Sequence, residues 1–164
     1  MEHYDSEMAA RVWQRVRGAA APVPATDTPS TQPLREAASL QSLIAGELAA
    51  ADLYDRLSRR REGGQSALLR RLSGEARGRA DCLRGICLIV TGSRPAVHTP
   101  APLREPMEAA LRKAYTHALS ALEEYESRTA SREYGAVFAE LARQQRAHCR
   151  FLLELLGGLS KNPV

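Results

Sequence analysis

Four long segments of the chain carry apolar residues three and four positions apart, and no segment alternates apolar and polar residues with a period of two. The first spacing places side chains on one face of an α-helix, whereas the second would indicate a β-strand. The four segments are residues 34–60, 66–91, 103–129 and 133–157. We therefore predict an all-α protein of four helices that pack through their apolar faces.

The connections between these segments predict how the helices pair. A Gly-Gly pair at 63–64 and a break around 129–135 are short, whereas the Pro-rich stretch 91–102 is longer. Short connections place successive helices side by side in opposite directions, and a long connection permits a crossover. We expect an antiparallel four-helix bundle made of two helical hairpins joined by a crossover.

The first part of the chain has a different character from the rest. Residues 5–17 predict a short amphipathic helix, and residues 19–33 form a stretch rich in Pro, Ala and Thr that is typical of a linker. We therefore divide the chain into an N-terminal helix and linker, 1–33, and a bundle domain, 34–164. The short helix either docks on the bundle or forms the interface of a homodimer.

Charge and cysteine content restrict the class of protein. The chain has 23 basic and 19 acidic residues and a net charge of +4, and its Arg residues are scattered among Glu residues, so we expect no nucleic-acid binding. Three cysteines without framework spacing indicate a reducing compartment rather than a disulfide scaffold. No apolar run has the length of a membrane span or a signal peptide. These features predict a soluble cytoplasmic protein without a membrane partner.

A weak internal repeat relates the two halves of the predicted bundle. Residues 67–83 align without gaps on residues 136–152, at an offset of 69. In the first helix of each half, Tyr54 corresponds to Tyr125. Two similar hairpins that face each other place equivalent positions around one shared centre.

A carboxylate falls on the inner face of the first helix. Glu47 lies seven residues before Tyr54, and a carboxylate in a core is costly unless a partner neutralises it. The pattern of Glu, six residues and Tyr, in a four-helix order with a Glu-x-x-His position in the second helix of each half, resembles the ferritin-like superfamily in its rubrerythrin-type branch. The resemblance covers residues 36–157 and implies six ligands that hold two iron or manganese ions between the helices.

Most of the ligand positions that the resemblance implies carry other residues in this chain. The six aligned positions hold Glu47, Ala76, Arg79, Ala118, Gln145 and His148. Only Glu47 and His148 keep the residue type of the family, and Gln145 stands where Glu is expected. The neighbouring residues Glu75 and His117 are one position out of phase, a rotation of about 100° on a helix.

We interpret this centre as a polar network in which Arg79 has replaced the metal. Its guanidinium faces the same centre as Glu47 and can form an ion pair with that carboxylate. The remaining members complete the network of Glu47, Tyr54, Arg79, Tyr125, Gln145 and His148.

The sequence then predicts a non-catalytic structural or partner-binding protein without a cofactor and without catalytic residues. One alternative is a single Fe, Mn or Zn ion held by Glu47, Gln145 and His148. Another is an active di-iron oxidoreductase or peroxidase, although Ala76 and Ala118 cannot supply bridging carboxylates. The protein partner is not identified by the sequence, and a homodimer is one candidate.

Overall fold

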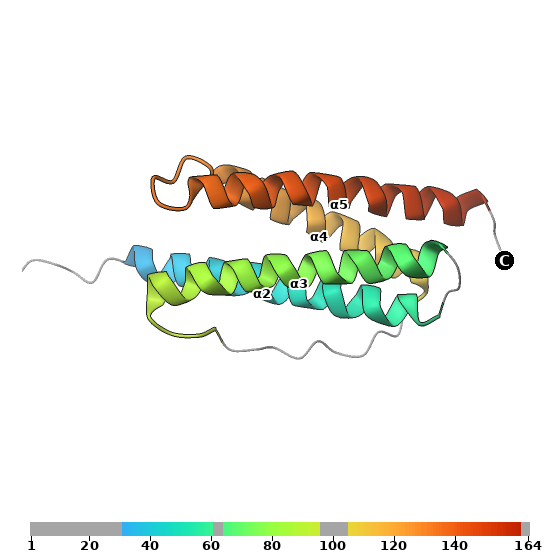
Figure 1. Cartoon of the computed structure of the whole chain (residues 1–164), viewed down its shortest axis with the longest axis horizontal. Coiled ribbons are helices and arrows are strands. Elements are labelled where there is room, and N and C mark those ends of the chain that lie inside the picture. Colours follow the sequence, from blue (N-terminus) through green and yellow to red (C-terminus); the bar gives the residue numbers. More distant parts are fainter. Residues whose placement is uncertain (1–30, 61–63, 96–104, 162–164) are drawn as a thin grey trace, which may run out of the picture. The chain divides into compact units, whose positions relative to one another are not determined.

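The computed structural model of the protein describes residues 31–60, 64–95 and 105–161. Within these residues the chain forms four α-helices and no strand, so the predicted all-α four-helix bundle is confirmed (Figure 1). The helices are α2 (Thr31–Ser58), α3 (Gly64–Thr91), α4 (Met107–Ser127) and α5 (Gly135–Lys161). The predicted N-terminal helix, 5–17, lies outside the described residues. No helix in the described part has the length and apolar composition that a membrane crossing requires.

The helix ends differ from the predicted ones for local reasons. Residues 31–33, predicted as linker, are helical, because Pro33 lies in the first turn, where its missing N–H costs no helical hydrogen bond. Pro106 occupies the N-cap of α4, so this helix begins four residues later than predicted. Helix α5 continues beyond the predicted end at 157 because Leu159 packs against the core. Gly92, at φ 69°, adopts the left-handed conformation that commonly ends a helix such as α3.

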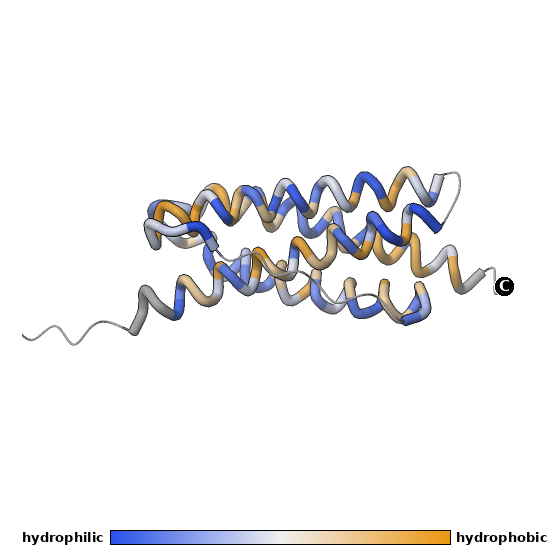
Figure 2. The backbone as a smooth tube through the Cα atoms, turned by 90° about the horizontal axis from the view of Figure 1, so that it is seen from below, coloured by the Kyte–Doolittle hydropathy of each residue, from blue (hydrophilic) through white to orange (hydrophobic). Residues whose placement is uncertain are grey.

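The bundle interior consists of two apolar clusters, one toward each end. The first cluster includes Leu57 of α2, Leu72 of α3, Leu111 of α4 and Leu152 of α5. The second is built from Leu40, Leu83, Tyr125 and Leu141 of the same four helices. Hydrophobic residues accordingly recur between hydrophilic ones along every helix (Figure 2).

The order in which each helix visits the two clusters gives its direction. Helices α2 and α5 run from the second cluster to the first, whereas α3 and α4 run from the first to the second. Each hairpin, α2–α3 and α4–α5, is therefore antiparallel, and α3 ends at the opposite end of the bundle from the start of α4 (Figure 1).

Two glycines should respond in opposite ways to replacement by Ala. A Cβ at Gly135, the first residue of α5, would lie too close to the carbonyl oxygen of Thr129, so the backbone must shift. Gly78 lies inside α3 with open space around it. We expect Gly135→Ala to lower the free energy of unfolding by about 1–3 kcal/mol and Gly78→Ala to raise it by about 0.5–1 kcal/mol. Urea denaturation measures both, and shifts of the same sign would contradict the close approach at Gly135.

Candidate functional site

A layer of polar side chains separates the two apolar clusters. Four of its members are almost inaccessible to solvent, with exposed fractions of 4% for Glu47, 1% for Arg79, 2% for Gln145 and 1% for His148. Tyr54 of the first cluster and Tyr125 of the second extend their hydroxyl groups into this layer. The bundle therefore contains a buried polar centre contributed by all four helices.

The Glu47 carboxylate of α2 forms a two-point ion pair with the Arg79 guanidinium of α3. Arg79 Nε donates to Glu47 Oε1 at 3.0 Å, and Arg79 Nη2 donates to Glu47 Oε2 at 2.9 Å. Tyr125 Oη of α4 donates to Glu47 Oε1 at 2.7 Å. Burial alone would lower the pKa of Arg79, but the attraction of Glu47 and the hydrogen bonds to it raise the pKa above its usual value. Arg79 therefore stays charged and neutralises the only carboxylate of the polar centre.

His148 of α5 lies between Arg79 and Tyr54. Its Nδ1 is 3.4 Å from Arg79 Nη2, and its Nε2 is 2.9 Å from Tyr54 Oη. Burial, and then the charge of Arg79, lower the pKa of His148 to about 3, so the imidazole is neutral at neutral pH. A guanidinium can only donate, so Nδ1 accepts from Arg79, and the ring proton on Nε2 is donated to Tyr54 Oη.

The two tyrosine hydroxyls are held in their protonated form. Burial and the nearby charge of Glu47 raise the pKa of both Tyr54 and Tyr125 above the usual value. Neither hydroxyl therefore ionises in the physiological range, and both act as hydrogen-bonding groups.

Gln145 of α5 contacts the layer differently from the prediction. Its Nε2 donates to the backbone carbonyl of Ala118 in α4 at 3.2 Å, rather than to another side chain of the network. Its Oε1 and Arg79 Nη1 are the two buried side-chain atoms without a hydrogen-bond partner in the described part of the chain. Buried polar atoms are usually paired, so these two atoms are exceptions that need an explanation.

The internal repeat places equivalent residues against each other. Arg79 and His148 occupy equivalent positions of the two repeats, and their side chains meet at the centre. Tyr54 and Tyr125 are also equivalent, and each contacts one member of the ion-paired layer, His148 and Glu47 respectively. The approximate symmetry of the sequence is thus visible in the contacts of the site.

The residues at the centre do not suit a bound metal ion. Both oxygens of Glu47 already accept from Arg79, and both ring nitrogens of His148 are engaged. A divalent cation beside them would also meet the charge of Arg79. Among residues 31–60, 64–95 and 105–161, no group of three His, Cys, Asp or Glu side chains could hold a metal.

The residues one position out of phase lie away from this centre. Glu75 pairs with Arg71 on the exposed side of α3, at 3.4 Å. His117 is exposed on α4, close to Gly46 of α2. Cys87 and Cys149 are buried and belong to the apolar clusters.

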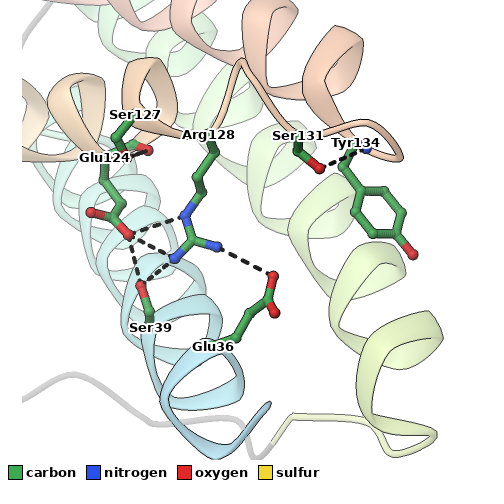
Figure 3. A network of polar contacts seen from close by, with 7 residues as sticks. All are labelled: Glu36, Ser39, Glu124, Ser127, Arg128, Ser131 and Tyr134. Carbon is green, nitrogen blue, oxygen red and sulfur yellow. Dashed lines mark hydrogen bonds and ion pairs between the residues drawn. The ribbon is translucent and has the colours of Figure 1, made fainter. Parts of the chain in front are cut away.

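A second polar cluster was not predicted from the sequence. Glu124 of α4 accepts hydrogen bonds from Ser39 of α2 at 2.9 Å and from Arg128 at 2.7 Å, and Arg128 also approaches Glu36 (Figure 3). The spacing of four residues between Glu124 and Arg128 could have indicated their pair. No spacing in the sequence relates either residue to Ser39, which lies on another helix.

Protein-family models, curated proteins and solved structures were each compared with the chain, and none matches it. The function of the protein is therefore inferred from the residues of the polar centre and their contacts.

Proposed function

We propose that this protein is a ferritin-like, rubrerythrin-related bundle in which the Glu47–Arg79 ion pair stands in place of a di-metal centre. We propose further that it is non-catalytic and acts as a structural or partner-binding protein. The observation that carries this proposal is the two-point contact of Arg79 with Glu47. Arg79 occupies the position at which the family resemblance implies a ligand His.

The charge of the centre supports a role without metal. A di-metal site brings several carboxylates together, and two divalent cations balance their charge. Here Glu47 is the one carboxylate, Arg79 supplies one positive charge, and His148 is neutral. The sum is close to zero before any ion is added, so an incoming dication would be an uncompensated buried charge.

The titration of the centre supports a role without acid–base catalysis. A general acid or base works best when its pKa is near the operating pH. The pKa of His148 is about 3, and the pKa values of the two tyrosines are raised above their usual value. None of these groups is suited to exchange a proton with a substrate at neutral pH.

Elemental analysis tests the proposal directly. The purified protein is incubated with Fe²⁺, Mn²⁺ or Zn²⁺, passed through a desalting column and analysed beside the double variant Glu47→Ala/His148→Ala. We expect no metal above the level of the double variant. About two ions per chain, lost in the double variant, would contradict the proposal and favour a di-iron centre. About one ion per chain would favour a single metal site at Glu47, Gln145 and His148.

A further inference from the structure

Pockets lie on both sides of α4. One, of about 250 Å³, lies between α2 and α4, and another, of about 460 Å³, lies between α4 and α5. The exposed large apolar side chains of the described residues are Leu88, Ile89, Leu119 and Leu153. Of these four, Leu153 lines the second pocket and none lines the first. The α4–α5 face therefore combines a pocket with an exposed leucine.

The ion pair of Glu126 with Arg146 shows which residues of the antiparallel α4 and α5 lie side by side (Figure 1). Seven residues earlier in α4 and seven residues later in α5, Leu119 lies beside Leu153, and the two are 37% and 49% exposed. One turn further along, about 5.4 Å, the pocket contains Gly157. Two projecting leucines are thus followed by a depression on the same face.

Gly157 keeps this depression open. The residue is exposed, and a Cβ at this position would meet no atom of another described element within 4 Å. Glycine inside a helix is about 0.5–1 kcal/mol less favourable than alanine. No contact among the described residues offsets this cost, but a second molecule that packs closely against the bare backbone would do so.

A projection and a depression on one face allow two copies of that face to interlock. A two-fold axis that passes between the two features, close to Thr116, places α4 antiparallel to α4 of the second copy. Leu153 of each copy then enters the pocket of the other copy beside Gly157. By the same symmetry, Leu119 of each copy meets Tyr115 of the other.

The charges of this face also match in the same arrangement. Arg112, Thr116, Leu119 and Glu123 recur every three or four residues and follow one stripe of α4. Because the axis lies near the middle of the stripe, Arg112 of each copy faces Glu123 of the other. Within one chain Arg112 pairs with Glu108 at 2.7 Å but is 65% exposed. The exposed Glu123 has no ion-pair partner in the described part of the chain.

The size of this face indicates how strongly two copies associate. It is about 17 Å long from Arg112 to Glu123 and about 20 Å wide across the two helices. A standard protein interface buries about 800 Å² per partner, and this face is smaller. We therefore expect a reversible dimer with a dissociation constant of about 10–100 µM.

We propose that the α4–α5 face binds a second copy of this chain through these reciprocal contacts. The dimer rests on the partner-binding role proposed above and names its partner. It does not involve the Glu47–Arg79 ion pair, which lies between the helices. A protein that stays monomeric would overturn the dimer alone, whereas metal uptake would overturn the ion-pair proposal alone.

Sedimentation equilibrium of the full-length chain from about 2 µM to 1 mM tests the dimer. We expect the average mass to rise from 18.0 kDa toward twice that value. Leu153→Glu should keep the chain monomeric, whereas Leu88→Glu, the same change on α3, should leave the association unchanged. A monomer at every concentration, or equal effects of the two variants, would overturn the proposal. Loss of the dimer in Trp13→Glu but not in Leu153→Glu would place the interface elsewhere and overturn it too.

A charge exchange tests the antiparallel arrangement. Arg112→Glu and Glu123→Arg each place like charges opposite each other twice in the dimer, so each should weaken it about tenfold at low ionic strength. The double variant Arg112→Glu/Glu123→Arg restores both pairs and should return the affinity to within about threefold of the unaltered protein. A double variant as weak as either single variant would refute the assigned contact.

A second substitution tests the contact at Gly157. Gly157→Leu fills the depression and should weaken the dimer at least tenfold. Gly74→Leu, at an exposed glycine of α3 that also has open space around it, is the matched control and should not weaken it. Unchanged association in Gly157→Leu would show that Leu153 does not enter this pocket.

Discussion

Arg79→Met should lower the free energy of unfolding by about 3–5 kcal/mol, because it leaves the Glu47 carboxylate buried without its cation. Methionine keeps much of the length of the arginine side chain, so the loss reports the missing charge more than a missing volume. The corresponding fall in melting temperature is roughly 10 °C for a chain of this size. Urea denaturation followed by far-UV circular dichroism measures the free energy.

A double variant separates the ion pair from packing in general. Glu47→Leu/Arg79→Met removes both charges, and we expect it to recover at least half of the loss caused by Arg79→Met. Recovery is incomplete because Tyr125 and His148 each lose a hydrogen-bond partner.

The surface supplies a matched control for this pair. Arg146 of α5 binds Glu126 of α4 at 2.6 Å, but its side chain is 54% exposed. Arg146→Met should therefore change the free energy of unfolding by less than about 1 kcal/mol. A loss in Arg79→Met no larger than that in Arg146→Met would show that the buried pair does not hold the centre together.

The second large effect is a dependence of stability on pH that originates at His148. Its folded pKa, about 3, lies below the value of about 6.5 expected in the unfolded chain. The unfolded state therefore takes up a proton below about pH 6.5 that the folded state does not. The stabilisation is complete above about pH 6.5 and is lost as the pH falls toward 3, with a slope of up to about 1.4 kcal/mol per pH unit.

His148→Gln isolates this contribution. A glutamine amide can still donate to Tyr54, but it does not titrate, so the other ionisable groups cancel in the comparison with the unaltered protein. We expect the difference in unfolding free energy between the two proteins to shrink steadily from pH 7 to pH 4. Parallel profiles for His148→Gln and the unaltered protein would contradict a neutral buried imidazole.

The four helices of the described residues could be predicted from the sequence because apolar spacing is a local property. The helix ends were harder to predict from the sequence, because one of them depends on tertiary packing and another on a single cap residue. Leu159 keeps α5 helical beyond Gly157 and Gly158 because it packs on the core. Such a tertiary contact overrides the low helix propensity of glycine. It joins residues far apart in the chain, so a short local segment of the sequence does not reveal it.

The contact of Glu47 with Arg79 could be predicted from the sequence for a different reason. A buried carboxylate needs a cation, and Arg79 is the basic residue that the repeat places on the same centre. The hydrogen-bond partner of Gln145 could not be predicted, because a backbone carbonyl has no signature in the sequence. The pocket between α2 and α4 could not be predicted either. It results from the spacing of the two helices, which is a tertiary property, and from the side chains between them.

The polar centre also fixes how far each helix can slide along its neighbours. Leucine and alanine surfaces can interlock at more than one longitudinal offset, since their contacts are similar from turn to turn. A slide of α3 by one turn along α2, about 5.4 Å, would part Arg79 from Glu47 and strand two charges in an apolar interior. The layer between the two clusters thus selects a single alignment of the bundle, as a polar residue in a coiled-coil seam selects one register.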